Sequence, residues 1–273
     1  MFDYAQIREY RAGDVPAMKR LWRDCFGDGE ELTAPFFEHL CGMGTGFAAV
    51  RDDKLIGMAF VLFAELRSAD LKRKDKISYI YAVAVEKTHR CHGIGEALTR
   101  ECVRYSHEQG AESVCTLPAS EKLYEWYEAV GNMHFVSCCE YENTVPSDEP
   151  AEIFELEADE YGWRRDDLLT GVPYVHFLYS FLQFWEALCR VCGGGLFACG
   201  DGIACGYVED GVLYIKEAIN KEAINDPPEF IPALCRKLGA AKAVVRRPSD
   251  DAEPFVCSDN PLPGGTVWNI ALD

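Results

Sequence analysis

The chain has little positive charge. Its 273 residues include 27 Lys and Arg against 45 Asp and Glu, which leaves a formal net charge of −18. A surface this acidic repels the phosphate backbone, so nucleic acid is excluded as the expected partner. The same charge favours cationic small molecules or basic peptides, although only weakly and non-specifically.

The chain also lacks long apolar runs and the marks of a secreted protein. No apolar run approaches the roughly 20 residues that cross a bilayer, and Met1–Arg11 lacks the apolar core of a signal peptide. We therefore expect a soluble, cytoplasmic monomer or homodimer without a membrane partner. The 13 cysteines are scattered through apolar segments, so we expect reduced thiols and no disulfide framework.

A metal site is not expected either. Cys189 and Cys192 form a Cys-x-x-Cys pair, with Cys199 and Cys205 downstream. A zinc site needs four ligands, usually as two close pairs. Because cysteines of this chain also occur singly in apolar positions, we read these four as core residues.

A change of composition divides the chain into two parts. Residues 143–160 combine Pro146 and Pro150 with a run of acidic residues, which is typical of a linker. We place a boundary after residue 146, which gives domains of residues 1–146 and 147–273.

The first part alternates strand and helix patterns, which indicates an α/β domain. We expect strands at 7–9, 46–50, 55–63, 77–85, 113–117 and 135–142, and helices at 15–25, 35–40, 94–107 and 120–130. The second part repeats some of this order, with strands at 195–199, 203–208, 212–219 and 241–246 and a helix at 229–238. Before these, residues 172–191 read as a long, aromatic-rich helical region. The repeated order indicates a duplicated architecture.

The most informative segment joins the strand at 77–85 to the helix that follows. It reads Arg90-Cys91-His92-Gly93-Ile94-Gly95. The first turn of a helix offers unpaired N–H groups and a positive dipole end, which suit a phosphate. Gly93 and Gly95 allow close approach to the backbone, and Arg90 adds a cation with several donors. The segment thus indicates a pyrophosphate site, with a ligand-free turn as the alternative.

Neither common nucleotide motif is present. The spacing is not Gly-x-Gly-x-x-Gly, which disfavours a dinucleotide fold, and no Gly-Lys-Ser/Thr ending follows. About thirty residues on, after the strand at 113–117, stands Trp126-Tyr127-Glu128-Ala129-Val130-Gly131. The two motifs in this order resemble the acetyl-CoA motif and the aromatic-Tyr-x-x-x-Gly motif of the GCN5-related N-acetyltransferase (GNAT) family. The resemblance covers most of residues 1–145.

The resemblance implies a mixed central sheet flanked by helices, with acetyl-CoA in the gap between two splayed strands. It implies that Tyr127 protonates the departing thiolate, since a phenol with a pKa near 10 is a plausible acid for a thiol. It implies direct transfer from acetyl-CoA to a primary amine of a small molecule or peptide, without an acyl-enzyme. The residues expected to bind acetyl-CoA are Val83, Ala84, Val85, Arg90, Cys91, His92, Gly93, Ile94, Gly95, Glu96, Ser120 and Tyr124.

The general base is the main departure from the family pattern. Family members often carry a carboxylate on the central strand, where this chain has Tyr79 and Tyr81. The base is then water relayed to Glu86, or none is needed. This gap leaves open an alternative, a non-catalytic protein that binds acetyl-CoA or CoA as a sensor or scaffold.

The second part lacks the loop motif. Asn220 and Lys221 follow its corresponding strand, and Pro227-Pro228 removes backbone donors where the loop would need them. The arrangement resembles tandem GNAT proteins in which the second copy is degenerate. Such a copy would pack against the first and help to wall the acceptor pocket.

Overall fold

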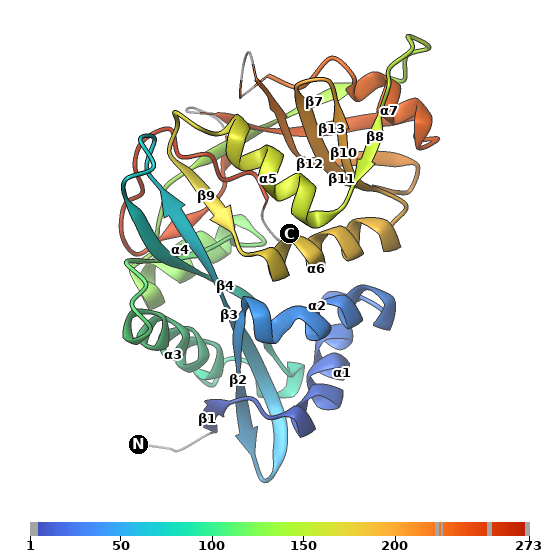
Figure 1. Cartoon of the computed structure of the whole chain (residues 1–273). Helices are drawn as coiled ribbons and strands as arrows, with labels where there is room; N and C mark the ends of the chain where they lie inside the picture. The colour runs from blue at the N-terminus through green and yellow to red at the C-terminus, as the bar shows by residue number, and fades with distance from the viewer. Residues whose placement is uncertain (1–4, 222–223, 225, 250–252, 271–273) are drawn as a thin grey trace.

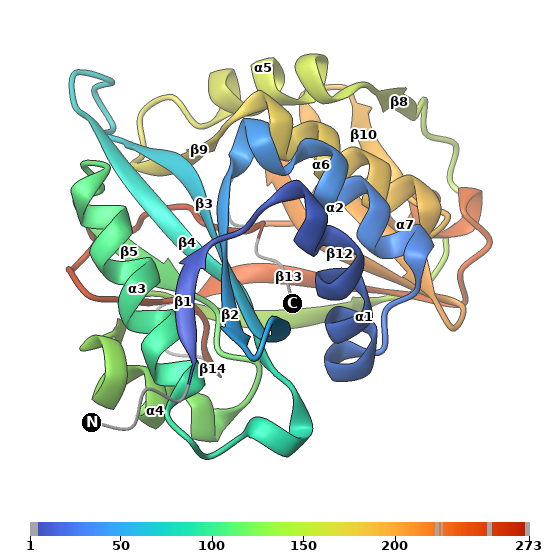
Figure 2. The same ribbon diagram turned by 90° about the horizontal axis from the view of Figure 1, so that it is seen from below.

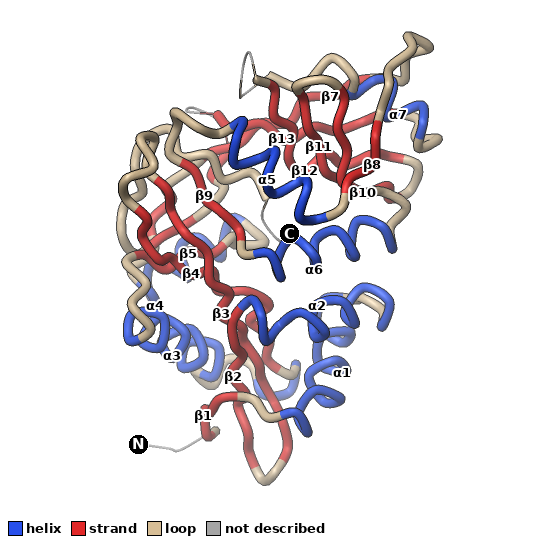
Figure 3. The backbone as a smooth tube through the Cα atoms, in the orientation of Figure 1, coloured by secondary structure: helices blue, strands red, loops and turns tan. Residues whose placement is uncertain are grey.

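The computed structural model describes residues 5–221, 224, 226–249 and 253–270. The chain forms two mixed sheets with helices packed on them, which confirms the expected α/β class (Figures 1 and 3). Within these ranges, no helix has the length and apolar character needed to cross a membrane.

The first sheet has the order β1-β2-β3-β4-β5-β15-β6. Only the β4–β5 pair of this order is parallel. Its strands are β1 (Gln6–Glu9), β2 (Gly44–Arg51), β3 (Lys54–Arg67), β4 (Lys74–Val85), β5 (Ser113–Thr116), β6 (His134–Phe135) and β15 (Cys257–Ser258). Its helices are α1 (Val15–Phe26), α2 (Glu30–Met43), α3 (Ile94–Glu108) and α4 (Glu121–Gly131), with short 3-10 turns at Ala12–Asp14 and Lys87–His89.

The second sheet has the order β14-β7-β13-β12-β11-β10-β8. Its strands are β7 (Cys138–Thr144), β8 (Phe154–Leu156), β10 (Gly195–Cys199), β11 (Gly202–Glu209), β12 (Val212–Asn220), β13 (Lys242–Ser249) and β14 (Glu253–Pro254). Its helices are α5 (Ala158–Leu168), α6 (Tyr179–Val191) and α7 (Ile231–Lys237). Between α5 and α6, β9 (Tyr174–Phe177) pairs with β3 of the first sheet.

The two halves share one plan, so the expected duplication of architecture is present. β8, β10, β11, β12 and β13 pair with one another as β1 to β5 do, with a parallel pair at the same place. A bulge interrupts the pairing of β3 with β4, and another interrupts that of β11 with β12. Helix α7 follows β12 as α3 follows β4.

The halves exchange their last strands. β7 follows the first half in sequence but pairs with β13, whereas β15 follows the second half and lies between β5 and β6. Asp259, next to β15, accepts the Val114 amide at 2.8 Å and lies 2.7 Å from the Nε2 atom of His107 at the end of α3. The boundary after residue 146 stays a prediction, and a cut there would separate both exchanged strands from their sheets.

Three apolar cores hold this arrangement. One lies under α3 and α4, on one face of the first sheet, and a second lies under α7. The largest fills the other face of the first sheet, where α1 and α2 pack, and continues into the second half (Figure 2). There α2 lies against α6, and the rings of Phe36 and Phe184 are 5.5 Å apart.

A buried ion pair joins α5 to β12. The Nε atom of Arg165 donates to Oε1 of Glu217 at 2.8 Å, and both side chains are almost fully buried. The hydroxyl of Tyr161 donates to the same oxygen at 2.8 Å. Breaking such a pair leaves an uncompensated buried charge, so it fixes how α5 sits on the sheet.

Several expectations about secondary structure are wrong in part. The expected strand at 135–142 is two strands, β6 and β7, in different sheets. The expected helical region at 172–191 begins with β9, and only Tyr179–Val191 is helical. Aromatic residues favour strands as well as buried helices. Pairing with β3 makes Tyr174–Phe177 a strand. The helix expected at 35–40 extends over Glu30–Met43, and α5 forms where no helix is expected.

Candidate acetyl-CoA groove

Strands β4 and β5 separate partway along their length. They pair in parallel only from Ile77 with Ser113 to Ile80 with Thr116. β5 ends there, whereas β4 continues to Val85. Among the described residues, no strand pairs with residues 81–85 on this side. The gap therefore leaves one backbone edge of β4 available to a ligand.

A bulge lies at the point where the strands separate. Register shifts between Met58 and Phe60 of β3, and Ala82 of β4 has a φ of 50°. Beyond the bulge, the Glu86 amide donates to the carbonyl of Ile56 on β3. Because strand groups alternate in direction, the N–H and C=O of Val85 point away from β3, into the gap.

The loop after β4 turns its backbone toward the same gap. Cys91 and Gly93 both have left-handed conformations, with φ of 63° and 78°. Gly93 is the N-cap of α3 and accepts the Ala97 amide. The first amides of the helix, from Ile94 to Glu96, have no intrahelical acceptor and sit at its positive dipole end. The loop thus presents several donors to an anion.

Space is left in front of this loop. A Cβ atom at Gly93 would meet no atom within 4 Å, and one at Gly95 would lie 3.6 Å from the ring of Trp126. Packing within the protein therefore does not require glycine at these two positions. The left-handed φ favours glycine at position 93, and the close approach of a ligand would favour glycine at position 95.

Arg90 braces the end of β4. Its Nε atom donates to the Val85 carbonyl at 3.0 Å, and Nη2 lies 3.5 Å from the sulfur of Cys25 on α1. The guanidinium is thus positioned between the strand end and α1, on the wall of the groove. His92 is exposed and its Nδ1 atom lies 2.7 Å from the Arg90 carbonyl, outside the groove lining.

Tyr127 of α4 forms the opposite wall. Its side chain is 7% exposed, and its ring lies 4.8 Å from that of Trp126. Burial raises the pKa of Tyr127 to about 12, although a hydrogen bond with Thr116 opposes the shift. The Thr116 hydroxyl also donates to the Ile80 carbonyl at 3.0 Å, which holds Thr116 beside this wall.

These elements enclose a groove of about 620 Å³. It brings together most of the residues expected from the sequence, namely Val83, Ala84, Val85, Arg90, Cys91, Gly93, Ile94, Gly95, Glu96 and Tyr127. Five residues that were not expected also line it: Cys25 and Phe26 of α1, His89 of the loop, and Leu123 and Trp126 of α4. The sequence does not indicate them, because α1 is remote in sequence, His89 belongs to no ligand spacing, and the α4 residues are equally typical of a helix core face.

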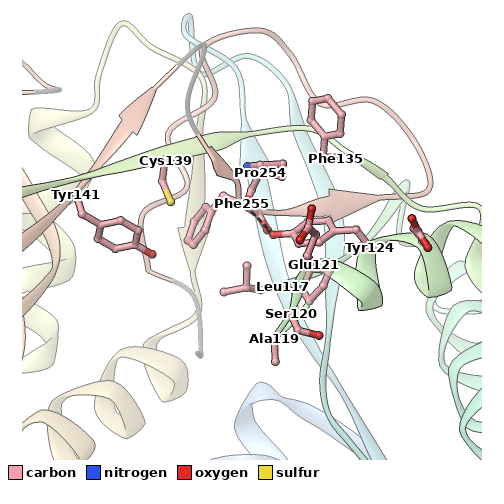
Figure 4. A pocket seen from close by; sticks show the side chains of 12 residues that line it. Leu117, Ala119, Ser120, Glu121, Tyr124, Phe135, Cys139, Tyr141, Pro254 and Phe255 are labelled. Carbon is pink, nitrogen blue, oxygen red and sulfur yellow. Dashed lines mark hydrogen bonds between the residues drawn. The ribbon is translucent and has the colours of Figure 1, made fainter.

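Ser120 and Tyr124 lie elsewhere. They line a separate pocket of about 780 Å³ where the end of β5 and the start of α4 meet β7 and β14. Figure 4 shows Cys139 and Tyr141 on one side of this pocket and Tyr124 on the other. The hydroxyl of Tyr124 donates to the carbonyls of Pro254 and Phe255. Tyr124 therefore links α4 to the stretch that leads from β14 to β15.

The central strand carries aromatic side chains where the family often has a carboxylate base. Tyr79 and Tyr81 stack with ring centroids 6.3 Å apart, on the face of the sheet where α1 and α2 pack. Glu86 is exposed and its carboxylate lies 3.1 Å from His89. The described residues contain no cluster of His, Cys, Asp or Glu side chains suited to a metal ion.

Comparisons with known proteins identify the fold. The family model of the acetyltransferase (GNAT) domain matches residues 6–129. A GCN5-related N-acetyltransferase from Kribbella flavida is 15% identical with a TM-score of 0.64, over 93% of this chain and 71% of that one. One from Anabaena variabilis is 12% identical with a TM-score of 0.66, over 93% and 72%.

A conserved protein of unknown function from Enterococcus faecalis is also similar, at 12% identity and a TM-score of 0.69 over 93% of this chain and 72% of that one. No curated protein matches the chain at significant sequence similarity. At these identities the solved structures show the fold alone. The matches with these structures extend over both halves of the chain.

Proposed function

We propose that the protein is an N-acetyltransferase that moves an acetyl group from acetyl-CoA to an amine, because residues 6–129 match the family model of the acetyltransferase (GNAT) domain. The observation that carries the proposal is the groove itself. An open backbone edge of β4 leads into the anion-binding start of α3, with Tyr127 on the facing wall.

The donor follows from the shape and chemistry of the groove. The amides of residues 91–96 and the dipole of α3 suit the pyrophosphate of CoA. Backbone groups of Val83 and the N–H of Val85 pair with the amides of the pantetheine arm, as an added strand would. The arm then carries the thioester toward the bulge at Ala82 and the phenol of Tyr127.

The reaction needs alignment and charge stabilisation more than reactive side chains. A neutral amine attacks the thioester carbonyl, forming a C–N bond. The C–S bond then breaks, and its electron pair stays on sulfur. Nitrogen loses one proton to solvent, and sulfur takes one from solvent after Tyr127, which faces it, has stabilised the departing thiolate with a hydrogen bond. The Val83 amide polarises the carbonyl oxygen as negative charge develops there.

Release of CoA thiol in the presence of a broad amine panel tests the proposal. We expect thiol release that requires both acetyl-CoA and an amine, with ternary-complex kinetics. Binding of acetyl-CoA without thiol release from any amine would instead favour a sensor or scaffold, for which the aromatic residues at Tyr79 and Tyr81 are the supporting observation.

A further inference from the structure

An aromatic side chain is exposed on the wall of the proposed acetyl-CoA groove. Phe26, the last residue of α1, lines the groove and is 46% exposed. Every other aliphatic or aromatic side chain among the described residues that line the groove is buried or half-buried. The Phe26 ring therefore offers the groove's largest apolar contact to a ligand.

Neighbouring residues hold the Phe26 ring in place. Trp22, one helical turn earlier, packs against it edge to face, with the ring centroids 5.7 Å apart. Trp22 is 3% exposed, and its indole N–H donates to Oδ2 of Asp28 at 2.8 Å. Gly27 ends the helix directly after Phe26, with a φ of 90° and its amide bonded to the Arg23 carbonyl. A ring fixed in this way loses little freedom when a ligand packs on it.

The end of α1 lies at the anion-binding end of the groove. The sulfur of Cys25, next to Phe26, is 3.7 Å from the Val85 carbonyl oxygen and 3.5 Å from Nη2 of Arg90. Val85 ends β4, and Arg90 belongs to the loop that leads to α3, where the pyrophosphate is proposed to bind. The thioester is proposed to lie farther back along β4, at the bulge beside Ala82. Phe26 is therefore placed at the pyrophosphate end.

Two parts of acetyl-CoA extend from the pyrophosphate. The pantetheine arm runs along β4 toward the thioester, and the adenosine extends from the other phosphate. Adenine is the one aromatic group of acetyl-CoA, and its flat face stacks well on aromatic side chains. An exposed, fixed ring at the pyrophosphate end suits this group.

We infer that Phe26 is the stacking platform for the adenine ring of acetyl-CoA, and that it makes the groove select the complete nucleotide over shorter thioesters. This inference rests on the proposed function, which takes acetyl-CoA as the occupant of the groove. Phe26 then contributes to donor binding and takes no part in the transfer itself.

Trp126 on the facing wall suits this role less well. Its ring lies 3.6 Å from the position of an added Cβ atom at Gly95 and 4.8 Å from the ring of Tyr127. Its half-buried ring is thus packed between the first turn of α3 and the phenol, along the path of the pantetheine arm.

The test measures binding by calorimetry for three thiols that share the pantetheine arm. They are CoA, dephospho-CoA, which keeps the adenine without the 3′-phosphate, and 4′-phosphopantetheine, which lacks the whole adenylate. The proteins are wild type, Phe26→Ala, Phe26→Tyr and Phe154→Ala, all purified free of CoA. Phe154 of β8 is the matched control, because it is 52% exposed and lines neither the groove nor the pocket of Figure 4.

We expect Phe26→Ala to raise the Kd of CoA and of dephospho-CoA at least about fivefold, since a stacked base contributes that much or more. The Kd of 4′-phosphopantetheine should stay within about twofold, which also shows that the variant is folded. Phe26→Tyr should keep the affinity of wild type, because its ring has the same flat face. Phe154→Ala should change none of the three Kd values.

Three results would overturn the inference. An equal loss of affinity for CoA and 4′-phosphopantetheine in Phe26→Ala would place the ring on the pantetheine arm. An unchanged Kd of CoA in Phe26→Ala would make Phe26 a surface side chain without a role in donor binding. A loss in Phe26→Tyr as large as that in Phe26→Ala would exclude stacking, since tyrosine stacks as phenylalanine does.

Thiol release from acetyl-CoA with a panel of amines separates this inference from the proposed function. CoA binding that depends on Phe26, without thiol release from any amine, would uphold the adenine platform and refute acetyl transfer. Thiol release with a KM for acetyl-CoA that ignores Phe26→Ala would uphold the transfer and refute the platform. Wild type that binds no CoA would refute both.

Discussion

Replacing Tyr127 with Phe removes one hydroxyl from the wall of the proposed acetyl-CoA groove. Burial raises the pKa of this phenol to about 12. A thiol ordinarily has a pKa near 8.5, so complete proton transfer from Tyr127 to the CoA thiolate is uphill. The phenol then acts mainly by donating a hydrogen bond to the sulfur as negative charge develops.

The size of the expected effect follows from that role. A hydrogen bond to a charged group contributes about 1.5–3 kcal/mol, which corresponds to about 10- to 150-fold in kcat. The stability cost is one neutral hydrogen bond, about 0.5–1.5 kcal/mol, because Thr116 keeps its bond to Ile80.

The assay is thiol release under saturating acetyl-CoA and amine, with Tyr105→Phe as the matched control. Tyr105→Phe removes the same hydroxyl from a tyrosine of α3, whose ring packs on Phe47 and lies outside the groove. We expect the Tyr127 variant to lose kcat while KM for acetyl-CoA stays within about twofold. An unchanged kcat for Tyr127→Phe would refute the donor role.

Two further predictions concern the links between elements. Glu217→Gln leaves Arg165 as an uncompensated buried charge, so we expect a loss of about 3–5 kcal/mol in the free energy of unfolding by denaturant. Burial lowers the pKa of His107, but its bonds with Asp259 and the Ala111 carbonyl outweigh this and raise it above 6.5. Protonated His107 therefore stabilises the folded state below pH 6.5, and this stabilisation is lost as the pH rises through the raised pKa. Between about pH 6 and 9, the Tm of wild type should fall relative to the Tm of His107→Gln.

The local elements of the candidate site could be predicted from the sequence. The apolar run before Glu86 and the glycines at 93 and 95 place a strand, a loop and a helix start without any long-range information. The left-handed Cys91 and Ala82 could not be predicted, because neither residue type favours that conformation. They follow from the bulge and from the turn into α3.

What the sequence could not supply is pairing between distant segments. β7 pairs with β13, and β15 pairs with β5 and β6, so each exchanged strand joins a segment far from it in sequence. The packing of α2 on α6 likewise joins residues far apart in sequence, such as Phe36 and Phe184, whose type indicates only a buried position.

The central claim is that the loop at the start of α3 binds the pyrophosphate of acetyl-CoA. It is tested most directly by thermal unfolding with and without acetyl-CoA, for wild type purified free of CoA, Gly93→Asp and Gly110→Asp. Gly93 and Gly110 lie at opposite ends of α3, both with positive φ and no atom within 4 Å of an added Cβ. The two variants therefore carry the same backbone strain and the same added charge.

At a hundred times its dissociation constant, acetyl-CoA should stabilise wild type and Gly110→Asp by about 2.7 kcal/mol. Gly93→Asp should gain nothing, because its carboxylate repels the pyrophosphate. Equal stabilisation of both variants, or none in wild type, would contradict the assignment of the groove and the function built on it.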